Sequence, residues 1–341
     1  MTRPEPTSSD VAQLAGVSQS AVSRAFTEGA SISEAKRAKV KAAAEQLGYQ
    51  PNLIARSLIT RRTGIIGLAV GNLSNPFYTQ LIYGLSEKLQ QRNYHLLLFT
   101  VPEASSSDAL LEDVINYRLD ALILTATELS SHLGARLHAR GVPVVLVNRT
   151  TEDASSSSVA SDNAFGAGEV ARYLVAQGHR RLAYVAGIQN TSTNVERERG
   201  FMRALSSMSD VTVQHVSGDY DTHKSLDVAR ELFSGDGPRP DAIFCANDAM
   251  ALSLIDALRF DLGLRVPEDV SVVGYDDIEP AASPTYQLTT YSQPIDDMVD
   301  AAIELVTERL TSPERAPRQV RLRGELVIRA SVTTSTGKQT Q

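Results

Sequence analysis

The sequence lacks the features that secreted, membrane-spanning and metal-binding proteins need. Its single cysteine, Cys245, cannot form an intramolecular disulfide, and no CxxC pair or Cys/His cluster is present to hold zinc or an iron–sulfur centre. No uninterrupted apolar run approaches ~18 residues, and the opening MTRPEPTSSD lacks the basic and apolar segments of a signal peptide. We therefore expect a cytoplasmic protein with no metal and no membrane span.

The motifs of common enzyme classes are missing as well. The chain has no GxSxG, P-loop, HExxH or paired-glutamate constellation, and its six histidines are scattered without metal-ligand spacing. Gly166 and Gly168 begin a GxG, but Ala171 follows where a third glycine would stand, so the dinucleotide fingerprint is weak. We expect no enzyme activity and no cofactor. The alternative is an α/β enzyme that carries a DNA-binding head.

The charges are unevenly distributed along the chain. The net charge of -7 by itself argues against a nucleic-acid partner, yet residues 1–62 contain nine Lys and Arg against five acids, which leaves a net charge of -11 for the rest. The length of 341 residues predicts two or three domains. The sequence thus predicts a small basic module joined to an acidic one, and the basic head argues against a secreted sugar-binding protein.

The basic part, residues 1–50, has the pattern of three short helices. Val11 and Leu14 share one helical face, Gly16 suits the exit, and Ser18 is a good N-cap for a second helix. A third helix runs from about Ser33 to Gly48. Two short helices joined by a tight turn are typical of a helix-turn-helix, whose second helix reads the major groove. The alternative is a three-helix bundle that packs on another part of the protein.

We expect residues 51–62 to form a hinge helix and linker between the two modules. The segment NLIARSLITRR has 11 residues, about three helical turns, and ends in Arg61 and Arg62. Because so short a helix is marginal in isolation, it needs a partner or DNA to order it.

These segments together resemble one protein family. The runs DVAQLAGVSQSAVSRAF and SEAKRAKVKAAAEQLGYQPN, with the ARSL segment, are similar to the head of the lactose-repressor (LacI/GalR) family of bacterial transcription regulators. The resemblance implies a homodimer on double-stranded, pseudo-palindromic operator DNA, with the second helix in the major groove and paired hinge segments in the minor groove. The residues it places at the DNA are Thr7, Ser18, Gln19, Ser20, Ser23, Arg24, Asn52, Ala55, Arg56 and Leu58.

Several of these residues have a second interpretation. Gln and Arg have the donor and acceptor geometry that base edges require, so Gln19 and Arg24 fit direct reading. Thr7 and Ser23 are as well explained as phosphate contacts or helix caps. Leu58 is either the apolar wedge in the central base step or a residue that packs in the bundle.

The acidic part, residues 63–341, alternates short apolar runs with amphipathic stretches. Such alternation predicts parallel sheets covered by helices on both faces. Two series, separated by the Ser-rich stretch 155–158, predict two lobes, and we expect the chain to pass between them near 160 and near 290. The strands are expected at 65–70, 95–99, 121–125, 143–148, 181–187, 212–216, 242–247 and 270–275, and the helices at 76–92, 106–117, 129–140, 165–177, 195–208, 223–233 and 248–260.

Polar and aromatic residues follow the predicted strands, where ligands bind in open α/β sheets. The resemblance identifies this part as the periplasmic-binding-protein-like (type I) sensor domain of the same family. The effector contacts that it implies are Phe77, Asn148, Arg149, Asp162, Arg197, Tyr220, Asn247 and Asp276. Amides, carboxylates and a guanidinium suit a polyhydroxylated ligand, so a sugar or sugar derivative is expected. Phe77 and Tyr220 could also serve packing alone, and Asp248 and Asp277 fit helix-start or structural roles.

The effector's charge is left open by the residues after the fourth strand. Many sugar-binding relatives have an acid there, whereas this chain has Asn148 followed by Arg149. Arg149 and Arg197 together would favour a sugar acid or sugar phosphate. Equally, Arg149 could pair with Asp162 or another acid.

The mechanism that we expect is effector-gated DNA binding. An effector in the cleft would rotate one lobe against the other and change the spacing of the two hinge segments in the dimer. Induction and corepression use the same two states, so the sequence leaves the sign open. The tail TTSTGKQTQ has no apolar heptads, so we expect no added oligomerisation helix.

Overall fold

The computed structural model describes residues 6–26, 29–50, 62–101, 114, 116–125, 131–151, 156–234 and 237–333. The chain divides into two compact units, Met1–Thr63 and Gly64–Gln341. Each unit is described by itself below. Among the described residues, no helix combines the length and the apolar composition needed to cross a membrane.

The first unit is a bundle of short helices with polar caps. Its helices are α1 (Ser8–Ala15), α2 (Gln19–Ala25) and α3 (Glu34–Leu47). Thr7 begins α1 with a capping box, in which its hydroxyl accepts from the amide of Asp10 (3.4 Å) and its own amide donates to the Asp10 carboxylate (2.8 Å). Gly16 ends α1 at φ 67°, a left-handed conformation that glycine adopts without steric cost. The tight turn that the sequence predicts between α1 and α2 lies between Gly16, which ends α1, and Ser18, the N-cap of α2.

The apolar faces of the three helices meet in one small core. Val11, Val22 and Val40 are almost completely buried there, together with Ala25 and Ala44. The guanidinium of Arg37 on α3 donates to the carbonyl of Ala25 (2.8 Å) and so ties the end of α2 to α3. The core and this hydrogen bond involve one side of α2, and the other side of the helix is exposed.

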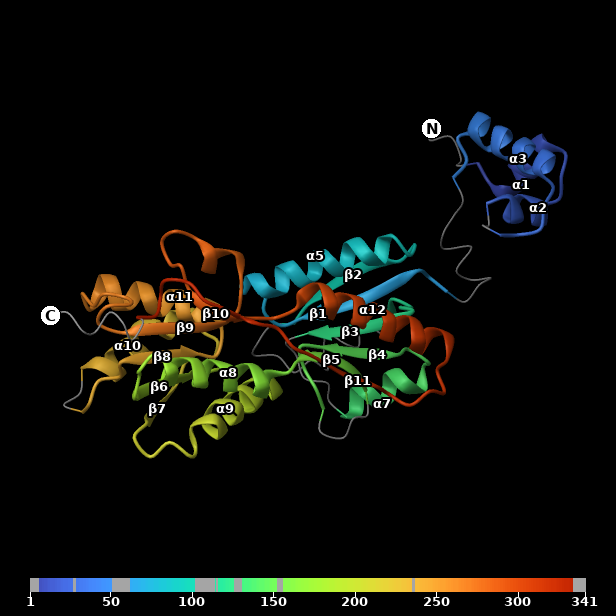
Figure 1. Ribbon diagram of the computed structural model, residues 1–341. Coiled ribbons are helices and arrows are strands. Elements are labelled where there is room, and N and C mark those ends of the chain that lie inside the picture. The colour runs from blue at the N-terminus through green and yellow to red at the C-terminus, as the bar shows by residue number, and fades with distance from the viewer. Residues whose placement is uncertain are drawn as a thin grey trace. The chain divides into compact units, whose positions relative to one another are not determined.

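The second unit has two α/β lobes (Figure 1). The first lobe has the strand order β11-β5-β4-β3-β1-β2, and all of its recorded strand pairs are parallel. Helices α5 and α12 pack against each other on this lobe, where Val299 lies close to Gly84. The described elements of the lobe are β1 (Ile65–Val70), α5 (Pro76–Gln90), β2 (His95–Thr100), β3 (Ala121–Thr125), α7 (Ser131–Ala139), β4 (Val144–Val147), β5 (Ser157–Ser161), α12 (Ile295–Thr311) and β11 (Gln319–Leu322).

The second lobe has the strand order β12-β10-β9-β8-β6-β7, in which the edge strand β12 runs antiparallel to β10. Tyr184, Phe201 and Phe244 stack in its core, with ring centroids 5.1–5.7 Å apart. Its described elements are α8 (Asn163–Ala176), β6 (Arg181–Ala186), α9 (Ser192–Leu205), β7 (Thr212–Ser217), the 3-10 turn Thr222–Lys224, α10 (Ser225–Phe233), β8 (Ala242–Cys245), α11 (Asp248–Asp256), the π-helical turn Ala257–Asp261, β9 (Ser271–Asp276), the 3-10 turn Glu279–Ala282, β10 (Thr289–Ser292) and β12 (Leu326–Val327).

The predicted fold class, a helical head with two parallel-sheet lobes, is confirmed, but the element list needs corrections. The Ser-rich stretch that we expected to separate the lobes overlaps the start of a completely buried strand, β5. Two of its three serines have hydroxyl partners, since the amide of Arg318 donates to the Ser157 hydroxyl (3.3 Å) and the Ser161 hydroxyl contacts that of Tyr275 (3.2 Å). The buried Ser158 hydroxyl has no partner among the described residues. The elements α12, β10, β11 and β12 were also missing from the prediction. The predicted helix 106–117 lies mostly outside the described residues.

The chain passes between the lobes three times, at residues 162, 293–294 and 323–325. The first two passages lie close to the positions expected from the sequence, and the third follows from the pairing of β11 with the first sheet and β12 with the second. Three connecting segments bring the carboxyl ends of the two sets of strands together. The candidate effector site lies there.

Candidate functional sites

The exposed face of α2 carries most of the residues that we expected at DNA bases. Ala21, Val22 and Ala25 are buried, whereas the four polar side chains between and before them are exposed: Gln19, Ser20, Ser23 and Arg24. Burial of one face therefore turns these polar groups outward together.

Local contacts hold this surface in place. The Ser18 hydroxyl caps α2 by accepting from the amide of Ala21 (3.3 Å). The side-chain amide of Gln19 donates to the Ser8 hydroxyl on α1 (2.8 Å), and the Nε of Arg24 donates to the backbone carbonyl of Ser20 (3.3 Å). Ser18 and Thr7 are thus caps in this structure. Of the other expected DNA contacts, Asn52, Ala55, Arg56 and Leu58 lie outside the described residues.

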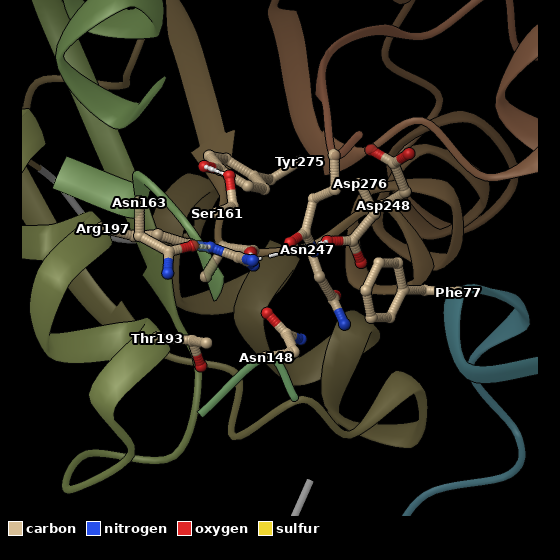
Figure 2. Close-up of polar contacts among 12 residues, drawn as sticks. Phe77, Asn148, Ser161, Asn163, Thr193, Arg197, Asn247, Asp248, Tyr275 and Asp276 are labelled. Carbon is tan, nitrogen blue, oxygen red and sulfur yellow. Dashed lines mark hydrogen bonds and ion pairs between the residues drawn. The ribbon is translucent and has the colours of Figure 1, made fainter. Parts of the chain in front are cut away.

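The second candidate site is built around an ion pair between Arg197 on α9 and Asp276 at the end of β9. A guanidinium nitrogen of Arg197 lies 3.5 Å from the Asp276 carboxylate, and the two side chains are 2% and 3% exposed. Figure 2 shows the pair among side chains from both lobes. Because burial of an uncompensated charge is costly, this arrangement requires further partners.

The partners of Arg197 fix its orientation. Its Nε donates to the Asn163 amide oxygen (2.9 Å), a second nitrogen donates to the carbonyl of Ala246, and the guanidinium lies 3.7 Å above the ring of Tyr275. Burial is the largest single effect and lowers the pKa of Arg197. The charge of Asp276 and the nearby tyrosines Tyr220, Tyr275 and Tyr184 together outweigh it, so the pKa is raised. Arg197 is therefore a charged donor held in one geometry.

Asp276 joins the lobes. It accepts from the Gln293 amide (2.7 Å) on the second passage between lobes and from the side chain of Asn75, the N-cap of α5 in the first lobe. Burial raises the pKa of Asp276, and the opposite charge of Arg197 acts against that shift. The carboxylate is therefore where side chains of both lobes converge.

The first lobe contributes Asn148 and Arg149 after β4. Arg149 donates to the carbonyl of Asn148 (3.0 Å) and to the hydroxyl of Thr193 on α9 (2.8 Å), so it connects the two lobes through neutral oxygens. Asp162 instead caps α8 and accepts from the Nε of Arg323 (3.2 Å) on the third passage. The predicted alternative of an Arg149–Asp162 pair is wrong in this arrangement, because Asp162 is engaged at the passages between the lobes.

The remaining predicted effector residues lie around this cluster with different exposures. Phe77, at the first turn of α5, is 1% exposed and points toward the cluster, and its ring meets that of Tyr78 edge-on at 5.1 Å. Tyr220 packs over Gly187, where any Cβ would lie 2.1 Å from its ring, and its hydroxyl is 3.3 Å from that of Thr193. Asn247 caps α11 by accepting from the amide of Met250 (3.0 Å).

Asp248 lies next to this cluster and is completely buried. Its carboxylate accepts from the hydroxyl of Thr290 (2.6 Å) and from the amide of Ile278 (3.0 Å). Burial and the nearby charge of Asp276 raise the pKa of Asp248 to about 7. Asp277 pairs with Arg329 at 2.7 Å. Both residues therefore have the structural roles that the sequence allowed.

Several polar residues of the cleft were not predicted as effector contacts. Asn163 and Thr193 lie on α8 and α9, and Gln293 follows a strand that was itself missed. The polar residues Asn75 and Thr125 do follow predicted strands, which was the available signal for both. Gln293 carried no such signal.

Three buried polar atoms at these strand ends and passages have no hydrogen-bond partner among the described residues. They are the Thr125 hydroxyl, the Asn148 Oδ1 and the Gln293 Oε1. Buried acceptors without partners are costly, and ligand hydroxyls would satisfy them. The described residues include no group of three or more His, Cys, Asp or Glu side chains arranged to hold a metal ion.

Comparison with known proteins places the two units in one family. Residues 7–52 match the model described as bacterial regulatory proteins, lacI family, and residues 171–332 match a periplasmic binding protein-like domain. The chain is 34% identical to the ribose operon repressor of Escherichia coli (strain K12) over 331 residues, which cover 95% of this chain and 99% of that protein.

Solved structures agree with this placement. A complex of the transcriptional regulator CelR with cellobiose is 32% identical and covers 96% of this chain and 99% of its own, with a TM-score of 0.72. The lac repressor dimer bound to operator shares the fold at 24% identity, with the same coverages and a TM-score of 0.84. The chain therefore belongs to the lacI family of bacterial regulatory proteins and is a DNA-binding transcriptional regulator rather than an enzyme.

Proposed function

We propose that the protein represses transcription as a homodimer on a pseudo-palindromic operator and that a small sugar bound between its lobes controls this binding. Residues 1–50 would bind DNA, residues 51–62 would form the hinge, and residues 63–341 would bind effector and form the dimer. The observation that carries the effector assignment is the buried Arg197–Asp276 pair beside three unpartnered polar atoms. The relatives named for ribose and cellobiose support a sugar as the ligand class.

The DNA-binding assignment is supported by the exposed polar face of α2. Gln19, Ser20 and Arg24 would read base edges, while Thr7, Ser18 and Ser23 would position the head through phosphate contacts or caps. Asn52, Ala55, Arg56 and Leu58 would act in the minor groove. Because a symmetric dimer presents two equal heads, its operator would have two half-sites.

Effector contacts are proposed for both walls of the cleft. Arg197, Asp276 and Asn247 of the second lobe would exchange hydrogen bonds with sugar hydroxyls, with Asn148 opposite. Phe77 and Tyr220 would cover apolar faces of the ring. Asp162 would act indirectly, from its position at the passages between lobes.

A phosphorylated or acidic sugar is a second candidate effector, favoured by Arg149. Arg149 is 8% exposed, and its hydrogen bonds to the described residues go to neutral oxygens. An anionic group would give this buried charge a charge-assisted partner.

The test of effector binding is a thermal-shift screen of the full chain against D-ribose, cellobiose, sugar acids, sugar phosphates and nucleosides. A ligand at 100 times its Kd stabilises by about 2.7 kcal/mol. Asp276→Asn should abolish the shift while the unliganded variant remains folded. A shift that persists in this variant would show that the effector lies elsewhere.

The test of DNA binding is operator selection from random duplexes, followed by titration of the selected site with the wild type and Arg24→Ala. The variant should lose operator binding and keep any effector-induced thermal shift. Loss of both would indicate a folding defect instead. Failure of the wild type to select any sequence would contradict the assignment.

A further inference from the structure

A chain of polar contacts leads from Arg197 out of the effector site to the other lobe. The Nε of Arg197 donates to the Asn163 oxygen (2.9 Å), and the Asn163 nitrogen donates to the Glu196 carboxylate (3.2 Å). Arg321 then donates to both oxygens of Glu196, each at 2.7 Å. Glu196 and Arg197 lie on α9 of the second lobe, whereas Arg321 lies on β11 of the first.

The geometry at Glu196 is that of a strong ion pair. Two parallel N–H donors on one carboxylate are the bidentate arrangement in which arginine binds most specifically. Glu196 is 13% exposed and Arg321 is 36% exposed, so the pair is partly shielded from water. Hydrogen bonding to Glu196 raises the pKa of Arg321. A partly shielded ion pair of this geometry stabilises the contact between its two side chains more than a fully exposed ion pair does.

Helix α9 connects the Glu196–Arg321 pair to the effector site, because it carries both Glu196 and Arg197. Adjacent residues of a helix point about 100° apart, so Glu196 reaches the region where the chain passes between the lobes while Arg197 reaches the cleft. Asn163 directly follows the first passage, and its amide contacts both side chains. A rotation of the lobes that separates Arg321 from Glu196 would release the Glu196 carboxylate, which accepts from the Asn163 amide and holds it in place.

We propose that Glu196 is a positioning residue, and that its ion pair with Arg321 holds both the observed arrangement of the lobes and the orientation of Arg197. The role as a link to effector binding rests on the proposed function of Arg197. An effector that contacts Arg197 and a lobe rotation that moves Arg321 would both change the hydrogen bonds of Glu196 and Asn163. Effector binding and lobe rotation are then coupled.

The test is a double-mutant cycle of Glu196→Gln, Arg321→Gln and the double variant in the full chain. The matched control is Asp269→Asn, which breaks the Arg265–Asp269 pair (2.7 Å) inside the second lobe. Arg321→Lys, which keeps the charge but not the fork, should retain part of the wild-type behaviour.

The first readout is the distance between spin labels at Gln90→Cys and Glu231→Cys, one on each lobe, in a mixture with excess unlabelled protein. Both sites are exposed, and the single native cysteine is buried and will not take a label. Both single variants should shift or broaden the distance distribution, and the double variant should add nothing further.

The second readout is the NMR signal of the Arg197 Nε–H, assigned by its loss in Arg197→Lys. In the wild type this buried proton is bonded to Asn163, so it should exchange slowly with water. In both single variants its signal should shift and its exchange should quicken at least threefold, while Asp269→Asn leaves it unchanged. Neither readout needs a ligand.

Unchanged distance distributions, an unchanged Arg197 signal, or additive effects in the double variant would each overturn the proposal. Titration with D-ribose as probe examines the proposed function separately. If D-ribose binds the wild type, both single variants should weaken it about three- to tenfold, and equal affinities would overturn the coupling. If D-ribose fails to bind, ribose sensing fails, whereas the two ligand-free readouts still decide the role of Glu196.

Discussion

At the scale of single residues, unusual backbone conformations gather at the candidate effector site. Asn148, Tyr220, Asp276 and Asp277 have positive φ values of 57°, 58°, 126° and 60°. Such conformations are costly for residues other than glycine, and they occur where the surroundings force them, often at functional sites. Each of these residues follows or ends a strand at the sheet edges where the candidate effector site lies.

Asp248 predicts a pH dependence of stability. Its pKa is raised from 3.8 to about 7, so between these values the folded state holds a proton that the unfolded state releases. The contribution of Asp248 to the free energy of unfolding therefore falls as pH rises from about 4 to 7. Asp248→Asn, which stays neutral, should flatten this part of the profile.

The measurement is chemical denaturation of both proteins from pH 4.5 to 8. The variant should match the wild type near pH 4.5 and exceed it in stability near pH 8. Parallel profiles would show that Asp248 is already ionised in the folded protein at low pH.

At the scale of elements, α8 and α9 approach so closely that one position admits glycine alone. A Cβ at Gly200 of α9 would lie 2.1 Å from the backbone carbonyl oxygen of Ala164 in α8. These two helices carry Asn163 and Arg197, so their spacing sets the geometry of the effector arginine.

Gly200→Ala should therefore separate the helices and destabilise the protein by about 1–3 kcal/mol, the usual cost of overpacking. It should also weaken effector binding, because the Arg197–Asn163 bond spans the altered gap. Gly237→Ala is the matched control, since no atom lies within 4 Å of its added Cβ. Equal melting temperatures of the two variants in calorimetry would contradict this account.

At the scale of the whole molecule, the charge distribution separates the two binding activities. The basic charge of residues 1–62 against the acidic remainder predicts that operator binding depends steeply on salt. For about six phosphate contacts, affinity should fall roughly 1,000-fold between 50 and 200 mM salt. Binding of a neutral effector should change by less than twofold over the same range, as measured by titration. A flat operator profile would exclude phosphate neutralisation as the main source of affinity.

Coupling between the sites predicts reciprocity. If the effector changes operator affinity by some factor, the operator must change effector affinity by the same factor. Couplings of this kind are typically about 5- to 150-fold. Titrating effector into free protein and into the protein–operator complex measures one factor, and operator titrations with and without effector measure the other. Unequal factors would show that further species, such as a dissociating dimer, take part.

How much the sequence predicts depends on how local the cause is. Caps and helical faces depend on neighbouring residues, so the three head helices and their turn were foreseeable from Ser18, Gly16 and the buried valines. The alternation of apolar runs likewise predicted most strands of both lobes. The strand β5 was missed because serines are typical of a loop. Two of its buried hydroxyls, on Ser157 and Ser161, have partners that are distant in sequence, Arg318 and Tyr275.

The sequence by itself determined the family, the two-module charge distribution and the identity of Arg197 and Asp276 as candidates, because each rests on local patterns or motif positions. The tertiary structure decided which groups meet. It paired Asp162 with Arg323 instead of Arg149, placed Gln293 on Asp276, and joined Arg321 to Glu196 across the lobes. These contacts join residues up to 161 positions apart, and the three passages between the lobes set them. Patterns among neighbouring residues cannot predict contacts between residues so far apart in the sequence.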